Sequence, residues 1–255
     1  MGVCIAGSLL AAGSAAADVA LPPFYTAANA LPAEGALGTV LMSEPVATGI
    51  PGAEAWRIAY VSSDAAGRKT ISTGLVAAPA GPPPEGGRPI VAWAHGTTGT
   101  AQNCGPSQVL DPARELNQYF LVGGDSWTDY GLPSVEAFIA KGNVVVATDY
   151  QGLGGGGKHQ YAVAATNARD VINAVRAAAS MPQTGAGRKA ALYGWSQGGG
   201  AMLAAAGLGD YIAATGTAAD GIEILGIVAL APDDVAAAAT SIPTDEASAE
   251  ALMSG

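Results

Sequence analysis

Short runs of apolar residues, rich in β-branched side chains, recur along the chain between segments with helical spacing. The clearest runs cover residues 90–94, 144–148, 190–193 and 224–230. Continuous apolar runs of this length are typical of strands that are buried on both faces of a parallel sheet. Because such strands alternate with helices here, the sequence predicts an α/β fold with a mostly parallel sheet, right-handed crossovers and flanking helices.

One intervening segment, residues 169–179, has a clear helical pattern. Its apolar side chains form a single stripe, which consists of Val171, Ile172, Val175, Ala178 and Ala179. Its polar side chains are expected to face outward, and they are Arg169, Asp170, Asn173 and Arg176. The pattern therefore predicts an amphipathic helix between the second and third apolar runs.

Upstream of the first run, apolar and polar residues alternate with period two around residues 56–60 and 71–75. A glycine-containing turn separates the two segments, so they predict an antiparallel hairpin at an edge of the sheet. Residues 21–25 and 31–32, which contain prolines, are expected to form an extended arm on the surface. The proline-rich segment 81–87 is expected to be a loop within the domain, because a strand pattern resumes directly after it.

Composition and charge exclude several classes of protein. Hydrophobic residues make up 49 % of the 255 residues, which is enough for a full core and excludes intrinsic disorder. The chain has 11 basic and 21 acidic residues, a formal net charge of −10, and no run of Lys or Arg. Nucleic acid and anionic membrane surfaces are therefore poor candidates for partners. The sequence does not predict an oligomeric state.

The beginning of the chain has a pattern of its own. Residues 1–17 carry no charge and end in three alanines before Asp18, which predicts a signal peptide cleaved after Ala17. The usual basic residues are missing, which is consistent with a start further upstream. The alternative is a buried N-terminal helix, but Gly7 and Gly13 would weaken it. We therefore expect a secreted or periplasmic protein.

Cysteine and histidine are scarce. Cleavage of the signal peptide would remove Cys4 and leave Cys104 as the single cysteine. That thiol is either inert and buried or paired with a partner outside the chain, and the sequence leaves both alternatives open. Two histidines and one mature cysteine show no metal-ligand spacing, so no metal site is predicted.

The segment Gly194-Trp195-Ser196-Gln197-Gly198 directly follows the third apolar run and precedes helix-forming alanines. Gly-x-Ser-x-Gly between a strand and a helix predicts a nucleophile elbow, in which a strained turn projects the Ser196 hydroxyl into a cleft. A Cβ atom at Gly194 or Gly198 would collide with neighbouring backbone. The backbone N–H of Gln197, at the start of the helix, is a predicted oxyanion donor. The alternative is an ordinary glycine-rich turn with an incidental serine.

A second motif, His95-Gly96-Thr97-Thr98-Gly99, directly follows the first apolar run. A loop of this type supplies the second oxyanion N–H in many hydrolases, and Gly96 or Thr97 is the predicted donor. His95 is expected to brace the loop by hydrogen bonds. A role for His95 as the catalytic base is the alternative.

A third motif, Asp-Tyr-Gln-Gly-Leu-Gly at residues 149–154, follows the second apolar run. Because it lies at the carboxyl end of a strand, we expect Asp149 and Tyr150, together with His95, to line the cleft. Asp149 is also expected to organise the loop. His159, a few residues further on, is either a cleft-lining or surface side chain or, alternatively, a base.

The same loop also matches Gly-x-Gly-x-x-Gly through Gly152, Gly154 and Gly157, which raises the alternative of a dinucleotide or phosphate site. The match is weak, because the glycines lie several residues beyond their strand. In addition, no acidic residue ends a strand about 20 residues further on, since Asp170 falls within the predicted helix.

In combination, these motifs resemble those of the secretory triacylglycerol lipases of the α/β-hydrolase superfamily. The resemblance extends from about Phe24 to Pro232. It rests on Phe24-Tyr25 and on the segments 92–99, 104–107, 148–154 and 194–199. It implies an exported enzyme with an α/β-hydrolase fold that hydrolyses lipid or small carboxylic esters without a cofactor. It also implies a cap inserted after the strand that ends near Leu230, and transient contact with a lipid interface.

The chain departs from the superfamily in its catalytic triad. Members supply the triad in the order Ser, acid, His, yet no histidine follows Ser196. The triad acid and histidine are therefore expected outside this chain. The expected organisation is a signal peptide (1–17), a partial α/β-hydrolase domain (18–232) and the start of a truncated cap (233–255).

Several functional alternatives stay open at this point. An inactive fragment, or a binder of apolar ligands on a hydrolase fold, would explain the missing histidine. A serine peptidase or an acyltransferase could use the same scaffold, because a fold alone does not fix the chemistry. Recruitment of His95 or His159 as the base is a further alternative.

Overall fold

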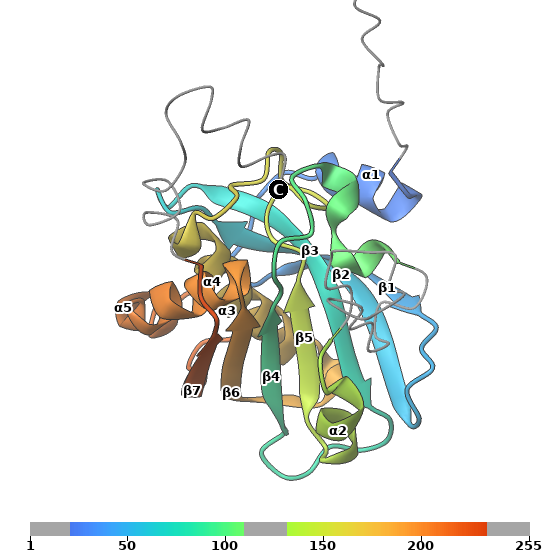
Figure 1. The fold of residues 1–255 in the computed structure, drawn as a ribbon. Coiled ribbons are helices and arrows are strands. Elements are labelled where there is room, and N and C mark those ends of the chain that lie inside the picture. Colours follow the sequence, from blue (N-terminus) through green and yellow to red (C-terminus); the bar gives the residue numbers. More distant parts are fainter. Residues whose placement is uncertain (1–20, 110–131, 234–255) are drawn as a thin grey trace, which may run out of the picture.

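A seven-stranded sheet with the strand order β1-β2-β3-β5-β4-β6-β7 forms the centre of the molecule (Figure 1). The computed structural model describes residues 21–109 and 132–233. The predicted signal peptide (1–17) and nearly all of the predicted cap segment (233–255) lie outside the described residues.

The helices and strands have the following bounds. The strands are β1 (Val40–Val46), β2 (Ala53–Ser63), β3 (Lys69–Pro79), β4 (Arg88–Ala94), β5 (Val144–Thr148), β6 (Ala186–Trp195) and β7 (Glu223–Leu230). The α-helices are α1 (Pro23–Asn29), α2 (Val135–Ala140), α3 (Ala164–Ser180), α4 (Gln197–Ala206) and α5 (Gly209–Ile212). Within the described residues, the short 3-10 helices are η1 (Gln102–Cys104), η2 (Pro106–Gln108) and η3 (Pro182–Thr184).

The four predicted apolar runs form the parallel half of the sheet. Neighbouring strands among β5, β4, β6 and β7 pair in parallel, with Ile90 of β4 opposite Val144 of β5. All residues of β5 are buried, and they alternate between two layers. Val144 and Val146 pack in the core that contains α3 and α4, whereas Val145 and Ala147 pack in the core that contains α2. Helices therefore cover both faces of the sheet, and the predicted α/β class is confirmed.

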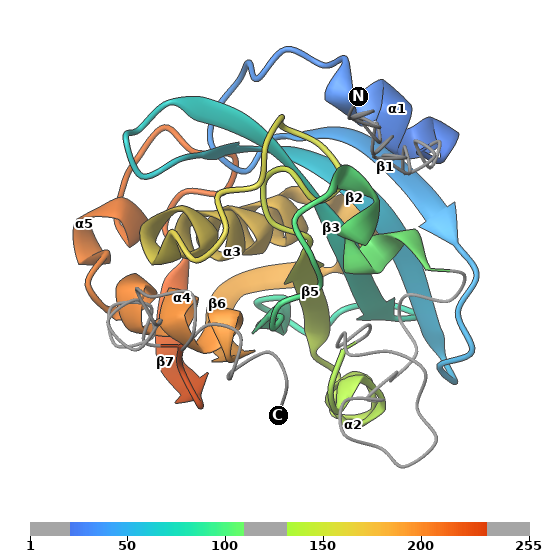
Figure 2. The ribbon, with the colours of Figure 1, turned by 45° about the horizontal axis from the view of Figure 1, so that its top comes forward.

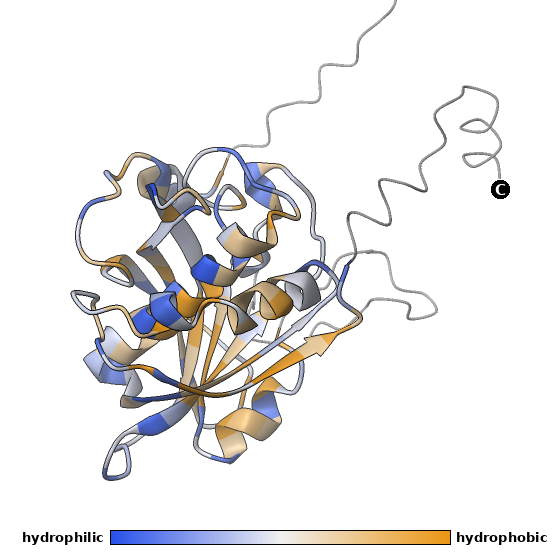
Figure 3. Ribbon diagram, turned by 90° about the vertical axis from the view of Figure 1, so that its left-hand side faces the viewer, coloured by the Kyte–Doolittle hydropathy of each residue, from blue (hydrophilic) through white to orange (hydrophobic). Residues whose placement is uncertain are grey.

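The prediction that residues 224–230 are buried on both faces is wrong. Among the described residues, β7 pairs only with β6 and so forms an edge of the sheet. Three of its large apolar side chains are about half exposed: Leu225 at 59 %, Val228 at 52 % and Leu230 at 46 %. Figure 3, turned so that the β7 side of the sheet faces the viewer, shows the hydrophobic colour of this edge strand.

The predicted hairpin is present, but it does not form the edge of the sheet. β2 and β3 pair along their whole length, from Ala53 opposite Pro79 to Ser63 opposite Lys69. Beyond them lies β1, which pairs antiparallel with β2 and was not predicted from the sequence. Its central residues read Ser-Glu-Pro, so the apolar alternation that marks a strand is absent there.

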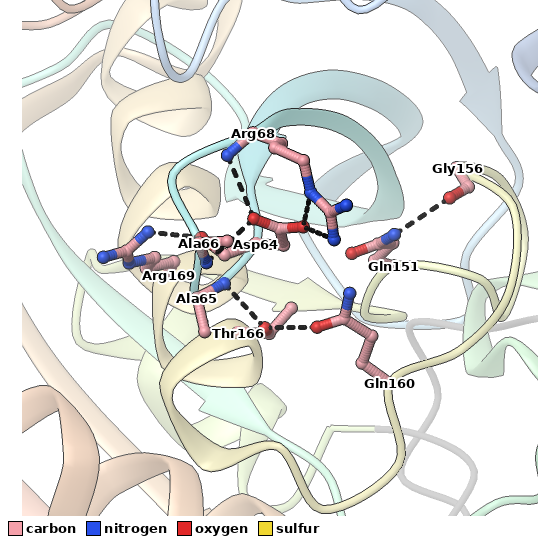
Figure 4. A network of polar contacts seen from close by, with 9 residues as sticks. All are labelled: Asp64, Ala65, Ala66, Arg68, Gln151, Gly156, Gln160, Thr166 and Arg169. Atoms are coloured by element: carbon pink, nitrogen blue, oxygen red, sulfur yellow. Dashed lines mark hydrogen bonds and ion pairs between the residues drawn. The ribbon is translucent and has the colours of Figure 1, made fainter.

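The turn of this hairpin is held by the carboxylate of Asp64 (Figure 4). Asp64 accepts hydrogen bonds from the backbone N–H groups of Ala66 and Arg68, both at 3.0 Å, and from the Arg68 side chain at 2.7 Å. The same turn contacts the start of α3, because the Ala65 N–H donates to Thr166 Oγ1 at 2.9 Å. The hairpin is thereby fixed to the helix layer.

The expectation of an extended arm at residues 21–25 is wrong, because α1 begins at Pro23. Proline is well suited to the first turn of a helix, since its fixed φ matches the helix and its missing N–H is not needed there. Phe24, Tyr25 and Ala28 are buried by this helix. They pack with Ala59 of β2 and with β3.

The expectation that the polar side chains of α3 face outward is also wrong for three of them. Asp170, Asn173 and Arg176 are fully buried. The cause differs along the helix. Asp170 faces the sheet, because its carboxylate accepts hydrogen bonds from the Ser72 hydroxyl of β3 and from the Gln151 N–H. Asn173 and Arg176 instead contact α5, which lies beside α3 (Figure 2). Asn173 donates to the Tyr211 hydroxyl at 2.7 Å, and Arg176 donates to the Ile212 carbonyl at 3.2 Å. Asn173 and Arg176 therefore join α3 to α5, and Asp170 joins α3 to the sheet and to the loop after β5.

None of the helices in the described part of the chain is long and apolar enough to span a membrane.

Candidate active site

Ser196 lies at the sharp turn between β6 and α4, where its backbone adopts φ 54° and ψ −118°. An L-residue rarely adopts a positive φ, and holding it costs about 1–3 kcal/mol. The Ser196 N–H donates to the Leu230 carbonyl at 3.1 Å, and the Asp233 N–H donates to the Ser196 carbonyl at 3.2 Å. The end of β7 therefore holds the strained turn, which lies in the strand–turn–helix context predicted from the sequence.

The glycines around Ser196 permit close contacts between backbones. A Cβ atom at Gly198 would lie 1.9 Å from the Ala94 carbonyl oxygen, and one at Gly194 would lie 2.5 Å from the Gly198 carbonyl oxygen. A Cβ atom at Gly199 would lie 2.6 Å from the Leu230 carbonyl oxygen at the end of β7. One at Gly200 would lie 2.0 Å from Asp233 Oδ1. The sequence analysis identified Gly194 and Gly198 but missed the other two, although the unbroken glycine run was a signal.

The loop after β4 lies against this turn, because β4 and β6 are parallel neighbours and end at the same edge of the sheet. A Cβ atom at Gly96 would lie 3.5 Å from Ser196 Cβ and 2.5 Å from the Trp195 indole. Thr97 follows and is exposed, and Gln197 begins α4 directly after Ser196. The structure therefore brings the two predicted donor segments to the predicted nucleophile.

His95 is buried, with 1 % of its surface exposed, and both of its ring nitrogens contact backbone carbonyls. Nδ1 lies 2.6 Å from the Gly96 oxygen, and Nε2 lies 3.2 Å from the Asp149 oxygen. Burial lowers the pKa of His95 to about 4, against the opposing effect of these carbonyls. His95 thus joins the loop after β4 to the loop after β5, and its ring nitrogens do not face Ser196.

His95 and Asp149 line a small cavity together with Trp93, Ser107 and Leu132. That these two residues and Tyr150 line the substrate cleft stays a prediction. Asp149 and Tyr150 are buried, at 1 % and 0 % exposure. The Asp149 carboxylate accepts hydrogen bonds from the Ser107 N–H at 2.8 Å, the Ser107 hydroxyl at 2.5 Å and the Thr73 hydroxyl at 2.7 Å. Burial raises the pKa of Asp149, while these hydrogen bonds oppose the shift. The Asp149 carboxylate accepts hydrogen bonds from segments that are distant in the sequence. It therefore holds the loops behind the site together.

Ser107 and Thr73 were not identified as functional residues from the sequence. Ser107 lies at the end of the motif at residues 104–107, and Thr73 lies within a strand pattern. Isolated hydroxyl residues carry no spacing signal, so their contact with Asp149 becomes visible only in the fold.

The glycine-rich loop after β5 does not have the geometry of a dinucleotide site. Such a site needs a helix that begins at the glycines, whereas α3 begins only at Ala164. The glycines serve close packing instead. A Cβ atom at Gly152 would lie 2.1 Å from the His159 nitrogen, and one at Gly154 would lie 2.2 Å from Thr73 Oγ1.

His159 contacts the residue after the predicted nucleophile and not the nucleophile itself. Its Nδ1 lies 2.8 Å from the Gln151 carbonyl oxygen, and its Nε2 lies 3.1 Å from Gln197 Nε2. The Gln197 amide also donates to Asn167 Oδ1 at 3.2 Å. Burial lowers the pKa of His159, and the hydrogen bond to Gln151 opposes this. The side chains of Gln197 and Asn167 were missed in the sequence, because no motif connects them.

In the part of the chain that the structure describes, no three His, Cys, Asp or Glu side chains are grouped so that they could hold a metal ion.

Cys104 is half-buried and forms no disulfide within the described residues. Its Sγ lies against Gly99, where a Cβ atom would approach it to 2.5 Å. The thiol therefore packs against the loop that carries Gly96.

A model of the secretory lipase family matches residues 125–242, a segment that includes Asp149 and Ser196. The chain is similar to the secretory lipases. The resemblance predicted from the motifs is thereby confirmed, and it supports a carboxylic ester hydrolase. No curated protein matches the sequence at a significant level.

The chain is also similar to solved structures. Lipase A of Candida antarctica in its closed state superimposes with a TM-score of 0.55 at 20 % identity, over 70 % of this chain and 40 % of that chain. A second structure of that lipase gives a TM-score of 0.55 at 19 % identity, over 75 % and 41 %. The rice cell wall degrading esterase LipA of Xanthomonas oryzae gives 0.49 at 25 % identity, over 70 % and 47 %.

The likeness to lipase A confirms the α/β-hydrolase fold for this chain. At such low identity it carries no further conclusion about chemistry. The chain spans about two fifths of the length of the lipase A structures that it matches.

Proposed function

We propose that the protein is an exported serine ester hydrolase that cleaves carboxylic esters of lipids through an acyl-enzyme on Ser196. The observation that carries the proposal is the strained turn, in which Ser196 has φ 54° and Gly96 lies against it. A simple structural turn has no need of a serine in this conformation. The similarity to the secretory lipases supports the ester as the bond that is cleaved, and it supports export.

In the proposed reaction, Ser196 Oγ attacks the carbonyl carbon of the ester, and the carbonyl oxygen becomes an oxyanion. The N–H groups of Gln197 and of Gly96 or Thr97 donate hydrogen bonds to this oxyanion. Collapse of the tetrahedral intermediate releases the alcohol and leaves the acyl group on Ser196. Water then releases the acid and restores the hydroxyl. This chemistry uses no cofactor.

The proposal assigns the general base to neither histidine of the chain. The ring nitrogens of His95 contact two backbone carbonyls, and those of His159 contact a carbonyl and the Gln197 amide. A base must lie within hydrogen-bond reach of the hydroxyl whose proton it takes. Both side chains instead support the segments around Ser196.

The similarity to the secretory lipases also supports a substrate class. We propose a triacylglycerol-type lipid or a small carboxylic ester as the substrate, with transient contact between the protein and a lipid interface. A net charge of −10 disfavours adhesion to anionic surfaces, so this contact would be made by apolar side chains.

Hydrolysis of p-nitrophenyl butyrate by the protein and by its Ser196→Ala variant tests the proposal. We expect p-nitrophenol release above the buffer rate for the protein and loss of that excess in the variant. Equal rates for the protein and the variant would contradict the proposal.

The second candidate function is binding of an apolar ligand without catalysis. The observation that favours it is that neither histidine of the chain contacts Ser196 within the described residues. Saturable binding of a fatty acid, unchanged by Ser196→Ala and without ester turnover, would support this candidate instead.

A further inference from the structure

We propose that His159 and Tyr161 are positioning residues that hold both predicted oxyanion-donor segments, an inference that rests on the proposed function. His159 contacts the side chain of Gln197, the donor after the nucleophile. Tyr161 contacts the side chain of Thr97 on the other donor segment, with 3.0 Å between the two hydroxyl oxygens. A single stretch between β5 and α3 thus touches both sides of the site.

The contact between His159 and Gln197 has a defined direction. The Gln151 carbonyl can only accept a hydrogen bond, so His159 Nδ1 carries the proton that is donated to it. Nε2 of the neutral ring then presents a lone pair to the Gln197 amide, which donates at 3.1 Å. That amide also donates to Asn167 Oδ1, and Gln197 is only 2 % exposed. The two acceptors therefore hold the Gln197 side chain in one orientation, which fixes the residue at the first turn of α4.

The aromatic rings form a continuous row behind the site. His95 and Tyr150 have ring centroids 4.3 Å apart, and Tyr150 donates to the His95 carbonyl at 2.9 Å. Tyr150 and His159 are stacked at 6.1 Å, and Tyr161 lies edge-on to His159 at 6.2 Å. The row starts at the residue before Gly96 and ends at the hydroxyl that contacts Thr97. It therefore connects the loop after β4 with the segment around His159 at two places.

The stretch itself is anchored to the rest of the fold. Gln160, between the two proposed positioning residues, accepts a hydrogen bond from Thr166 Oγ1 of α3 at 2.6 Å (Figure 4). Gln151 donates to the Gly156 carbonyl at 3.1 Å within the same loop. His159 and Tyr161 thus project from a segment that α3 holds in place, as a positioning role requires.

Two matched variants separate positioning from a general structural role. In His159→Gln, the amide oxygen can occupy the position of Nε2 and accept from Gln197. In His159→Asn, the shorter amide can replace only Nδ1 and donate to the Gln151 carbonyl. Both side chains are neutral amides, so they differ mainly in whether the Gln197 contact survives.

The readout is the rate at which Ser196 reacts with a p-nitrophenyl alkylphosphonate. In this reaction the bond from Ser196 Oγ to phosphorus forms, the bond to p-nitrophenolate breaks, and the hydroxyl proton passes to the buffer. The phosphonyl oxygen occupies the oxyanion site, so the rate reports the position of the donors. We expect His159→Asn to lower the second-order rate constant about 3- to 10-fold, because one hydrogen bond is lost. The rate constant of His159→Gln is expected to stay within about twofold of that of the unsubstituted protein.

A double-mutant cycle supplies the second test. In a Gln197→Met background, His159→Asn is expected to have no further effect, because the partner is already absent. Tyr161→Phe and Thr97→Val, two exposed substitutions that keep the backbone N–H groups, are expected to show the same non-additivity. Circular dichroism and thermal unfolding establish that each variant is folded. Should a His159 variant fail to fold, the Tyr161 and Thr97 pair decides the proposal.

The outcomes separate the two proposals. If the protein does not react at Ser196, the proposed function falls, and this inference falls with it. If the protein reacts but the two His159 variants lower the rate constant by the same factor, or the double-mutant cycles are additive, the positioning role alone is overturned.

Nitrogen-15 NMR of His159 gives a readout independent of reactivity. We expect a protonated Nδ1 and an unprotonated Nε2. A protonated Nε2 would overturn the direction assigned to the hydrogen bond with Gln197.

Discussion

Gly198 and Ala94 lie so close that a Cβ atom on the glycine would be 1.9 Å from the alanine carbonyl oxygen. This contact joins the first turn of α4 to the end of β4, and it thereby brings the loop of Gly96 to Ser196. The close approach of two backbones, more than any single side chain, sets the geometry of the site.

Gly198→Ala is therefore expected to destabilise the protein by about 3 kcal/mol or more, because backbone must move to admit the methyl group. It should also lower the reactivity of Ser196, since α4 and the turn would shift together. Gly226→Ala in β7 is the matched control, because a Cβ atom there meets nothing within 4 Å. Urea denaturation measures both variants. Equal free energies of unfolding for the two would contradict the role assigned to the close contact.

Asp149 is expected to be the most important buried acceptor behind the site. Asp149→Ala leaves the Ser107 N–H and the Ser107 and Thr73 hydroxyls without their acceptor. Each buried donor left unpaired costs about 1–3 kcal/mol, so we expect a loss of roughly 3–5 kcal/mol in the free energy of unfolding. Replacement of the exposed Glu85 by Ala should change it by less than about 0.5 kcal/mol. A loss below about 1 kcal/mol for Asp149→Ala would show that the network is dispensable.

The buried carboxyl of Asp170 predicts a pH dependence of stability. Ser72 and the Gln151 N–H donate to this carboxyl, yet burial raises its pKa from 3.8 to about 6. The folded state thus binds the proton more tightly than the unfolded state. This contribution to stability is fully present below about pH 4 and is lost as the pH rises through 6.

Asp170→Asn is expected to remove that dependence, because an amide does not titrate in this range. Raising the pH from 4 to 6.5 should lower the free energy of unfolding of the protein by roughly 2 kcal/mol relative to the variant. His95 titrates in the same window with the opposite sign, since its pKa is lowered to about 4. The comparison is therefore made against the variant at each pH, by denaturation with urea. Parallel pH profiles for the two proteins would rule out the raised pKa.

The elements that the sequence predicted correctly are those encoded by local patterns. The apolar runs of β4, β5 and β6 and the strand–turn–helix context of Ser196 depend on neighbouring residues alone. The edge strand β1 was missed because Glu44 and Pro45 interrupt its alternation. Helix α1 was interpreted as an extended arm because of its prolines, although Pro23 occupies a position where a helix accepts one.

Contacts between distant segments could not be predicted. Asn173 and Arg176 of α3 are buried by contacts with α5, more than thirty residues further along the chain. Asp170 is buried by a contact with Ser72 of β3, 98 positions away. The contact between His159 and Gln197 likewise joins residues 38 positions apart that share no motif. For the same reason the positions of His95, Asp149 and Tyr150 after strands were predictable, but their burial by neighbouring loops was not.

The central claim is that Ser196 is a nucleophile, and covalent labelling tests it most directly. The protein is treated with a p-nitrophenyl alkylphosphonate, digested, and analysed by mass spectrometry beside Ser196→Ala. We predict one phosphonyl group per chain, on the peptide that contains Ser196, with release of one equivalent of p-nitrophenolate. No label in the protein, or the same label in Ser196→Ala, would contradict the account.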